Sequence, residues 1–260
     1  MILLETKNLV KRYSGRTVVN GVSIKVNQGE IVGLLGRNGA GKTTSFRMTI
    51  GMVIPDGGTV MFDGADVSKL PMYKRARLGM GYLSQEPSIF QRLSVRDNLN
   101  AILETMKMSK ATRKEKCDQL LEQFSLTVQQ KQPASTLSGG ERRKLEIARA
   151  LVTNPTMILL DEPFSGVDPI AVEDLQQEIL NLRDRGISIL LTDHNVRETL
   201  TVTDRSYIMD SGKVLREGKP QDLVNDELVR KTYLGRTFRG DEFDIERYRT
   251  NTSYDNPGEE

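Results

Sequence analysis

A glycine-rich loop, set between an apolar run and a segment that can form a helix, constrains this chain most. Residues 36–44 read Gly-Arg-Asn-Gly-Ala-Gly-Lys-Thr-Thr, after the apolar run 31–35 and before 45–50. This is the G-x-x-x-x-G-K-[ST] pattern in the strand–loop–helix setting that its chemistry requires. In such a loop the backbone N–H groups and the positive end of the helix dipole face a phosphate. The loop therefore predicts a phosphate site, in which Lys42 reaches the terminal phosphates and the Thr43 hydroxyl binds Mg²⁺.

Two carboxylates follow a second apolar run. The run 157–160 predicts a buried strand, and Asp161 and Glu162 stand at its C-terminal end. In open α/β sheets ligands bind at that end, and paired acids are costly there unless a cation or a reaction uses them. Asp161 suits a water-mediated contact with Mg²⁺, and Glu162 suits a general base for an attacking water. His194 is the only histidine and follows the next buried run, 187–192, a position that favours a functional role over a structural one.

Three further features each have two interpretations. Ser138 and Glu141 form a capping-box pattern before the helical segment 142–151, which indicates either a well-capped helix or another anion site. Tyr13 is either a surface tyrosine or a ring for a nucleotide base. Gln85 follows a short predicted strand, where a glutamine is ordinarily a polar loop residue, and it gains interest from the phosphate loop elsewhere in the chain.

Composition excludes several classes of protein. A net charge of +2 over 260 residues gives no basic excess for binding nucleic acid. The basic stretches 72–77 and 110–114 are interpreted as solvated faces. A single cysteine, Cys117, excludes an intrachain disulfide and a multi-cysteine metal site, and its helical neighbours predict that it packs in a core. The length suits one large domain or one domain with two lobes.

The ends of the chain and its hydropathy bear on location. Residues 1–5 lack the pattern of a signal peptide, and no apolar run approaches the length of a membrane span. We therefore expect a cytoplasmic protein that reaches a membrane only through a partner. Beyond Gly240 aliphatic residues nearly vanish, which predicts a folded domain at 2–238 and a flexible tail at 239–260.

In this order the motifs resemble the ATP-binding cassette (ABC) ATPases, over about residues 2–238. The signature Leu-Ser-Gly-Gly-Glu at 137–141, combined with the phosphate loop and the acid pair, makes the resemblance specific, and a P-loop kinase would have no use for that signature. The resemblance implies an α/β fold with a P-loop NTPase core, an N-terminal antiparallel β subdomain and an inserted α-helical subdomain at about 86–150. It also implies ATP hydrolysis with ATP and Mg²⁺ as cofactors.

The family's motifs assign roles residue by residue within one chain. Tyr13 would stack on adenine. The residues that would hold the phosphates of ATP are Asn38, Gly39, Gly41, Lys42, Thr43 and Thr44. Those that would support Mg²⁺ are Thr43, Gln85 and Asp161. The catalytic residues would be Glu162, which activates water, His194, which contacts the γ-phosphate, and Gln85, which also senses the transmembrane partner.

The resemblance further implies a homodimer. Ser138 and Gly140 would bind the γ-phosphate of the ATP held by a second copy, and Asp168 would cross the dimer interface. Several stretches are similar to the ATPase subunits of lipopolysaccharide-export transporters: 85–90, 93–99, 161–169 and 192–200. In those transporters a groove near Phe90 and Arg92 would receive a helix of the membrane permease, so we expect the chain to lie on the cytoplasmic face of the inner membrane.

Other interpretations stay open at this point. Arg37 and Ser84 stand where many relatives have proline, and Gln91 stands where a basic residue is expected. The ATPase of another transporter, such as a branched-chain amino-acid importer, is one alternative, and a soluble cassette protein that does not transport is another. Phe90 itself, by composition, suits an interface anchor and the core of the helical subdomain equally well.

Overall fold

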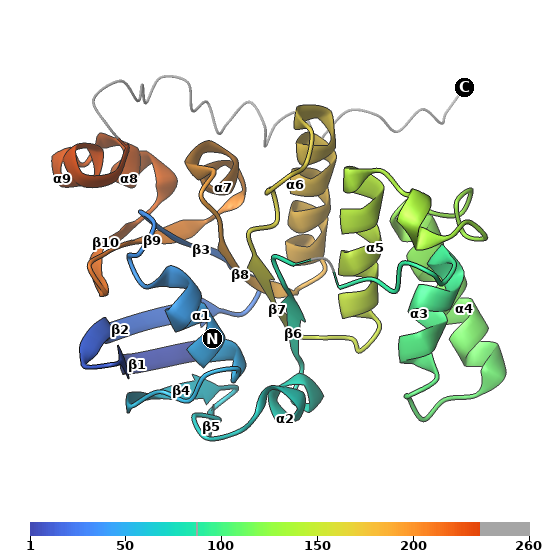
Figure 1. The fold of residues 1–260 in the computed structure, drawn as a ribbon, viewed down its shortest axis with the longest axis horizontal. Helices are drawn as coiled ribbons and strands as arrows, with labels where there is room; N and C mark the ends of the chain where they lie inside the picture. The colour runs from blue at the N-terminus through green and yellow to red at the C-terminus, as the bar shows by residue number, and fades with distance from the viewer. Residues whose placement is uncertain (87, 235–260) are drawn as a thin grey trace.

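The computed structural model describes residues 1–86 and 88–234, so the predicted tail at 239–260 lies outside the described residues (Figure 1). Within the described residues, the main sheet has six strands in the order β10 (Lys213–Gly218), β9 (Arg205–Asp210), β3 (Ile31–Gly36), β8 (Ser188–Thr192), β7 (Met157–Asp161) and β6 (Met80–Leu83). The strands from β9 to β6 are parallel, and β10 pairs with β9 antiparallel.

A second sheet is antiparallel and comes mostly from the N-terminal part of the chain. Its order is β2 (Arg16–Asn27), β1 (Ile2–Tyr13), β4 (Gly57–Phe62) and β5 (Ala65–Asp66). In β2 the side chains of Val22, Ile24 and Val26 are buried while their neighbours are exposed. This alternation is that of a strand with one face on a core, and it confirms the predicted antiparallel β subdomain.

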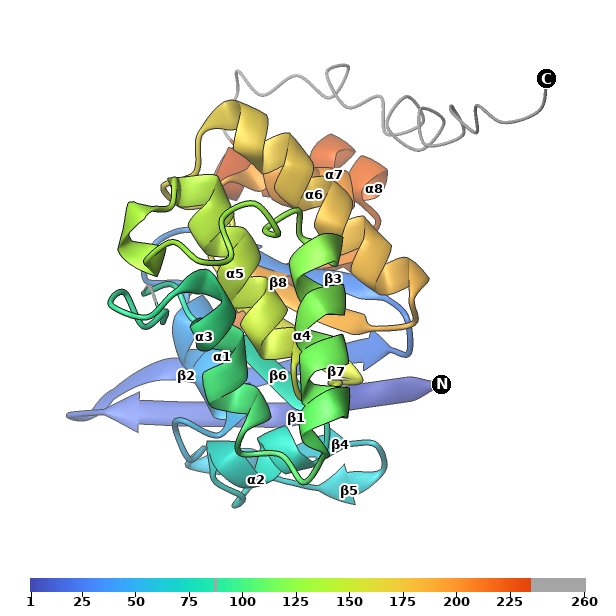
Figure 2. The same ribbon diagram turned by 90° about the vertical axis from the view of Figure 1, so that its right-hand side faces the viewer.

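The helices cover both faces of the main sheet (Figures 1 and 2). Their bounds are α1 (Lys42–Ile50), α2 (Met72–Arg77), α3 (Val95–Leu103), α4 (Lys110–Gln123), η1 (Ala134–Thr136), α5 (Gly139–Leu151), α6 (Pro169–Asp184), α7 (Val196–Val202), α8 (Pro220–Asn225), α9 (Glu227–Val229) and η2 (Arg230–Leu234). In the two described ranges no helix combines the length and the apolarity that crossing a bilayer requires.

Alternate residues of each buried strand enter two different cores. Met157 and Leu159 of β7 pack with α1 and the antiparallel sheet, whereas Ile158 and Leu160 pack with α3 to α6. A parallel sheet covered on both faces needs such a continuous apolar strand, which explains why the run 157–160 has no polar alternation. The arrangement brings the C-terminal ends of β3, β7 and β8 to one edge of the sheet.

The inserted helices form a lobe beside the main sheet, at the right of Figure 1. Val95, Leu99 and Leu103 line one buried face of α3. Cys117 of α4 is fully buried in the same core, which confirms the packing predicted for it. Since α5 also contributes to this core, the lobe is continuous with the face of the sheet that α6 covers.

The basic stretch 72–77 was expected to form a solvated face, and for Arg75 this expectation is wrong. Its side chain is fully buried, and its guanidinium donates hydrogen bonds to four carbonyl oxygens. Two of these, Met48 O at 2.9 Å and Thr49 O at 2.6 Å, lie in the last turn of α1, where helix carbonyls lack partners. Burial lowers the pKa of Arg75 to about 10. The pattern of basic residues could not show that α1 would bring its C-terminal end to this helix.

Arg75→Met is expected to destabilise the fold. The substitution keeps much of the volume but leaves buried carbonyl oxygens without donors, and one such oxygen costs roughly 1–3 kcal/mol. Urea unfolding should therefore give a clearly lower midpoint than the parent. Lys74→Met, at an exposed position of the same helix, is the matched control and should unfold with the parent. Equal midpoints for both variants would contradict the structural role of Arg75.

Candidate functional site

The phosphate loop has the predicted strand–loop–helix form. β3 ends at Gly36 and α1 begins at Lys42, with Gly41 at the N-cap in the left-handed region at φ 98°. A Cβ on Gly36 would lie 2.3 Å from the carbonyl oxygen of Met209, so no larger residue fits there. Lys42 is 8% exposed, and its Nζ donates to Gly36 O at 2.6 Å and to Arg37 O at 3.1 Å. The loop thus folds back over the side chain of its own lysine, and the free N–H groups of the first turn of α1 lie at the end of the loop.

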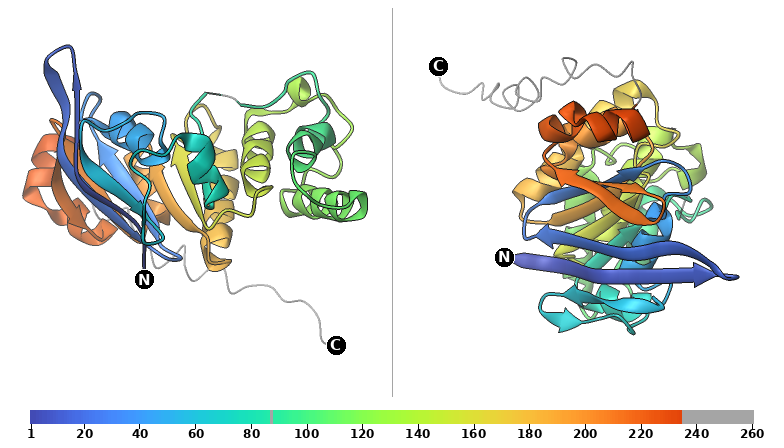
Figure 3. Two further views of the ribbon diagram at one scale, coloured as in Figure 1. Left: turned by 90° about the horizontal axis from the view of Figure 1, so that it is seen from below. Right: turned by 90° about the vertical axis from the view of Figure 1, so that its left-hand side faces the viewer.

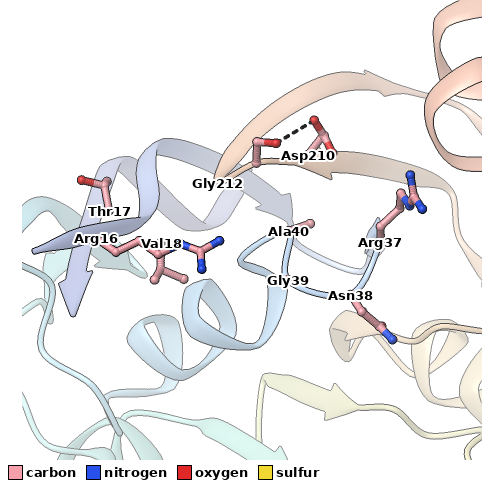
Figure 4. A pocket seen from close by; sticks show the side chains of 10 residues that line it. Arg16, Thr17, Val18, Arg37, Asn38, Gly39, Ala40, Asp210 and Gly212 are labelled. Carbon is pink, nitrogen blue, oxygen red and sulfur yellow. Dashed lines mark hydrogen bonds between the residues drawn. The ribbon is translucent and has the colours of Figure 1, made fainter. Parts of the chain in front are cut away.

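A cavity of about 630 Å³ adjoins this loop (Figure 4). Its lining comes from β2, from the loop at 37–40 and from the turn between β9 and β10: Arg16, Thr17, Val18, Arg37, Asn38, Gly39, Ala40, Asp210, Ser211 and Gly212. Tyr13 does not line it but pairs with Arg16 across β1 and β2, and its ring is 46% exposed. Lys11 Nζ lies 5.5 Å from the centre of that ring. An exposed tyrosine beside Arg16, which lines the cavity, agrees with the surface tyrosine and with the base-stacking interpretation alike.

The acid pair stands at the end of β7. Asp161 is 2% exposed, and burial together with the charge of Glu162 raises its pKa, against the effect of a hydrogen bond from the Tyr82 hydroxyl at 3.3 Å. Burial also lowers the pKa of Lys42, and the charges of Glu162, Asp193 and Asp161 oppose that shift. The lysine of the phosphate loop and the carboxylates of β7 and β8 therefore belong to one electrostatic site.

Three strand ends meet at Glu162. Gln85 follows β6, and its Nε2 donates to Glu162 Oε2 at 2.7 Å. His194 follows β8, and its Nδ1 lies 3.4 Å from the same oxygen. Glu162 itself has a left-handed backbone with φ 49°, which costs a residue with a side chain about 1–3 kcal/mol. The structure thus brings together the three residues that the sequence predicts as catalytic, with a strained backbone at their centre.

The signature residues gather at a different place. Ser138 caps α5, and both hydrogen bonds of the predicted capping box with Glu141 are present. A Cβ on Gly140 would lie 2.7 Å from the Cβ of Ala171, so Gly140 permits the close approach of α5 to α6. Asp168 caps α6 by accepting the N–H of Ala171 at 3.0 Å. Figures 1 and 3 show β6 and β7 between α1 and α5, so the fold does not bring the signature to its own phosphate loop.

One face of α5 holds the residues that follow β6. Arg143 donates to Ser84 O at 3.0 Å and to Asp161 O at 3.3 Å, and it forms a buried ion pair with Glu146 at 2.8 Å. Glu146 accepts the N–H of Ser88 at 2.9 Å, and Arg149 donates to the carbonyl oxygen of the same serine. The helix that begins at the signature therefore binds the backbone on both sides of Gln85, at Ser84 and at Ser88. We call Arg143, Glu146 and Arg149 the α5 stripe.

The sequence from residue 19 to residue 165 matches the family model of the ABC transporter. This chain belongs to the ABC transporter family. The lipopolysaccharide export system ATP-binding protein LptB of Haemophilus influenzae is 53% identical over 240 residues, which cover 92% of this chain and 100% of that protein. A probable ABC transporter ATP-binding protein of Azorhizobium caulinodans is 56% identical over 231 residues, 89% of this chain and 82% of that protein.

Solved structures agree with the fold of an ABC ATPase. The ADP conformation of MJ1267, an ATP-binding cassette of an ABC transporter, superimposes with a TM-score of 0.82 and 30% sequence identity. The match covers 90% of this chain and 99% of that cassette. The predicted α/β architecture with its antiparallel β subdomain and helical elements is confirmed, and the chain is an ABC ATPase.

The oxygen donors of this ABC ATPase fit a Mg²⁺ ion that also has phosphate and water as ligands. In the described ranges no group of three or more His, Cys, Asp and Glu side chains could hold a metal ion by itself. Asp161, the Thr43 hydroxyl and the Gln85 amide supply hard oxygen atoms, and Mg²⁺ typically takes only one or two carboxylates, with phosphate and water as its other ligands. The donor set therefore fits an ion that arrives with a nucleotide.

Sequence reasoning missed two residues of this site in the ABC ATPase. Tyr82 donates to Asp161 from the neighbouring strand β6, and its position next to a strand end was the available signal. Asp193 is fully buried directly before His194. An acid at the end of an apolar run had already drawn attention to Asp161, and the same signal applies to Asp193.

Proposed function

We propose that this chain is the ATP-hydrolysing motor subunit of a lipopolysaccharide-export transporter. The observation that carries the proposal is the meeting of Gln85 and His194 at Glu162, beside the phosphate loop. Identity of 53% to LptB of Haemophilus influenzae, over the whole of that protein, supports the export system as the partner. The chain would lie on the cytoplasmic face of the inner membrane, bound to a permease.

The geometry supports separate roles for the residues that would bind the phosphates, the base and the Mg²⁺ ion of ATP. The N–H groups at the start of α1 and the Lys42 ammonium bind the phosphates of ATP, while Tyr13 offers its exposed ring to the base. Thr43, Asp161 and Gln85 would hold Mg²⁺, which supplies positive charge to the β- and γ-phosphates when bound. Other residues of the phosphate loop, Asn38, Gly39, Gly41 and Thr44, complete the cradle.

Glu162 is proposed as the general base. Its carboxylate accepts a proton from the attacking water as the water oxygen bonds to the γ-phosphorus and the bond to the leaving ADP oxygen breaks. Gln85 donates to Glu162 Oε2 and so restrains the direction in which the carboxylate points. His194 has a side chain that is 53% exposed, which leaves its ring accessible to a γ-phosphate.

A second copy would complete the site. Ser138 and Gly140 lie at the N-terminal end of α5, which presents free N–H groups and the positive end of a helix dipole. Because β6 and β7 separate that end from α1, these groups suit the γ-phosphate of an ATP bound by another subunit (Figure 1). Asp168, at the N-cap of α6 next to them, would cross the interface.

Phe90 is proposed as the anchor for the permease. Its ring is 46% exposed under the guanidinium of Arg149 at 4.7 Å, so the interpretation of Phe90 as a core residue is wrong. Asn98 of α3 fixes the backbone by accepting the N–H of Phe90 at 2.8 Å and donating to its carbonyl oxygen at 3.0 Å. Ile89, one residue earlier, is the side chain that enters the core. Arg92 is exposed nearby and suits the rim of the contact.

Phe90→Ala is expected to uncouple the subunit from its permease without unfolding it. Loss of a buried aromatic anchor at an interface costs on the order of 2 kcal/mol, or about 30-fold in affinity. The isolated variant should keep the parental thermal midpoint and ATPase rate, while co-purification with the permease falls. Arg92→Ala should act in the same direction more weakly. Ile54→Ala, another exposed apolar residue, is the control and should assemble normally.

The identity of the permease is tested by purifying the tagged chain from its own membranes. We expect the membrane subunits of a lipopolysaccharide exporter in the purified complex, identified by mass spectrometry. Recovery of the permease of an amino-acid importer instead would overturn the export assignment while leaving the ATPase intact. Normal assembly of Phe90→Ala with the recovered permease would place the contact elsewhere on the surface.

A further inference from the structure

Asp193 joins two segments of the site through its two carboxylate oxygens. The side chain is fully buried at the end of β8. Its Oδ2 accepts the N–H of Phe164 at 2.9 Å, and its Oδ1 accepts the N–H of Asn195 at 2.9 Å. Oδ1 also lies 3.5 Å from His194 Nδ1. One buried carboxylate thus touches the segment after Glu162 and the segment that carries His194.

The bond to Phe164 bears directly on Glu162. The end of β8 accepts two N–H groups from the chain around Glu162: Thr192 O accepts that of Glu162 itself at 2.7 Å, and Asp193 accepts that of Phe164. Between these two hydrogen bonds the backbone of Glu162 takes its left-handed conformation at φ 49°. A strained conformation persists only where its surroundings hold it from both sides.

The chemistry of a carboxylate explains why an acid stands at this position. Phe164 is itself 1% exposed, so water cannot replace the acceptor of its N–H. A hydroxyl or an amide would offer one oxygen, whereas Asp193 uses a separate oxygen for each of the two segments. The two accepted N–H bonds favour the charged form of Asp193, against burial, which raises its pKa most.

We infer that Asp193 is a positioning residue that holds Glu162 in its left-handed conformation, so that the Glu162 carboxylate meets Gln85 and His194. The inference rests on the proposed role of Glu162 as the base in ATP hydrolysis. It assigns to Asp193 no contact with ATP and no proton transfer. The inference requires the effect of Asp193 on the rate to pass through Glu162 and not through its other neighbour His194, and a double-mutant cycle with Glu162 measures that dependence.

The experiment compares four proteins: the parent, Asp193→Ala, Glu162→Gln and the double variant. Asp193→Ala should lower kcat by about tenfold or more, because the base loses its position, while the affinity for a fluorescent ATP analogue stays within about threefold. In the Glu162→Gln background the same substitution should change the residual rate by no more than about twofold. Asp193→Asn, which keeps one acceptor oxygen, should fall between the parent and Asp193→Ala.

Asp204→Ala is the matched control. This aspartate also accepts a backbone N–H, that of Ile31 at 2.9 Å, but it precedes β9 at the other end of the sheet. It should lower the thermal midpoint and leave kcat within about twofold at a temperature where the protein is folded. If Asp193→Ala does not fold, Asp193→Asn takes its place in the cycle.

The outcomes separate two failures. An equal loss of rate from the Asp193 substitution in both backgrounds, or a loss of ATP affinity as large as the loss of kcat, would overturn the inference about Asp193 while Glu162 remains the base. A parental rate for Glu162→Gln alone would instead overturn the proposed role of Glu162, and the inference with it.

Discussion

Glu162→Gln is expected to slow ATP turnover by about two to four orders of magnitude, the usual contribution of a general base. The amide keeps the size of the carboxylate and can still hydrogen-bond, but it cannot accept a proton from water. ATP should bind with nearly parental affinity because Lys42 and the N–H groups at the start of α1 are unchanged. A dimer that forms around ATP should consequently persist, since hydrolysis is what would reopen it.

Two measurements check this expectation. Steady-state release of phosphate gives the turnover, and size-exclusion chromatography with ATP shows whether a dimer accumulates. Glu115→Gln, an exposed position on α4, is the matched control and should hydrolyse ATP like the parent and form no lasting dimer. Parental turnover by Glu162→Gln would show that another group activates the water.

Two inactive variants are expected to restore activity when they share a dimer. Lys42→Ala removes the ammonium that is proposed to bind phosphate, and Ser138→Arg places a bulky cation at the signature. If each site takes Lys42 from one copy and Ser138 from the other, the mixed dimer has one site with both lesions and one with neither. Random pairing in a symmetric dimer should then restore up to about a quarter of the parental sites.

The mixing experiment needs two controls, one for the stability of Ser138→Arg and one for pairs in which every site has a lesion. Ser138 caps α5, and loss of an N-cap costs about 0.5–2 kcal/mol, so the thermal midpoint of Ser138→Arg must be measured first. Mixing Lys42→Ala with a chain that carries both substitutions should restore nothing, because every site then has a lesion. Failure to recover activity in confirmed mixed dimers would contradict the sharing of sites between subunits.

The parts of the fold that were predicted correctly depend on neighbours close in sequence. The capping box of Ser138 and Glu141 spans one helical turn, and the apolar run 157–160 marks a strand wherever it lies. Asp161, Glu162 and His194 were singled out because they follow buried strands, and ligands bind at that end of an open α/β sheet. The role of Gln85 beside them came from the resemblance to the ABC ATPases, since a glutamine after a strand is ordinarily a polar loop residue.

The remaining features depend on contacts between distant segments. Arg75 looked like part of a solvated face because nothing near it in sequence reveals that it lies against the end of α1. Asp193 accepts the backbone N–H of Phe164, which lies 29 residues away in the sequence. Phe90 and Ile89 are both apolar, and their neighbours in sequence do not show that Asn98 of α3 binds the backbone of Phe90 and that Ile89 enters the core. In each case the deciding hydrogen bonds join residues that belong to different segments of the chain.

The α5 stripe links two sites thermodynamically: the proposed permease contact near Phe90 and the signature at the start of α5. In the helix that begins at Ser138, Glu146 and Arg149 bind the N–H and the carbonyl of Ser88, Arg143 binds the carbonyl of Ser84, and Arg149 also covers the ring of Phe90. If Phe90 anchors the permease and the signature binds nucleotide, as proposed, a permease that prefers one placement of α5 changes the affinity of the signature for nucleotide. By reciprocity of linked equilibria, nucleotide at the signature must change the affinity for the permease by the same factor. Binding of the permease and binding of nucleotide would then be linked through the same helix, so that either one could be detected as a change in the affinity for the other.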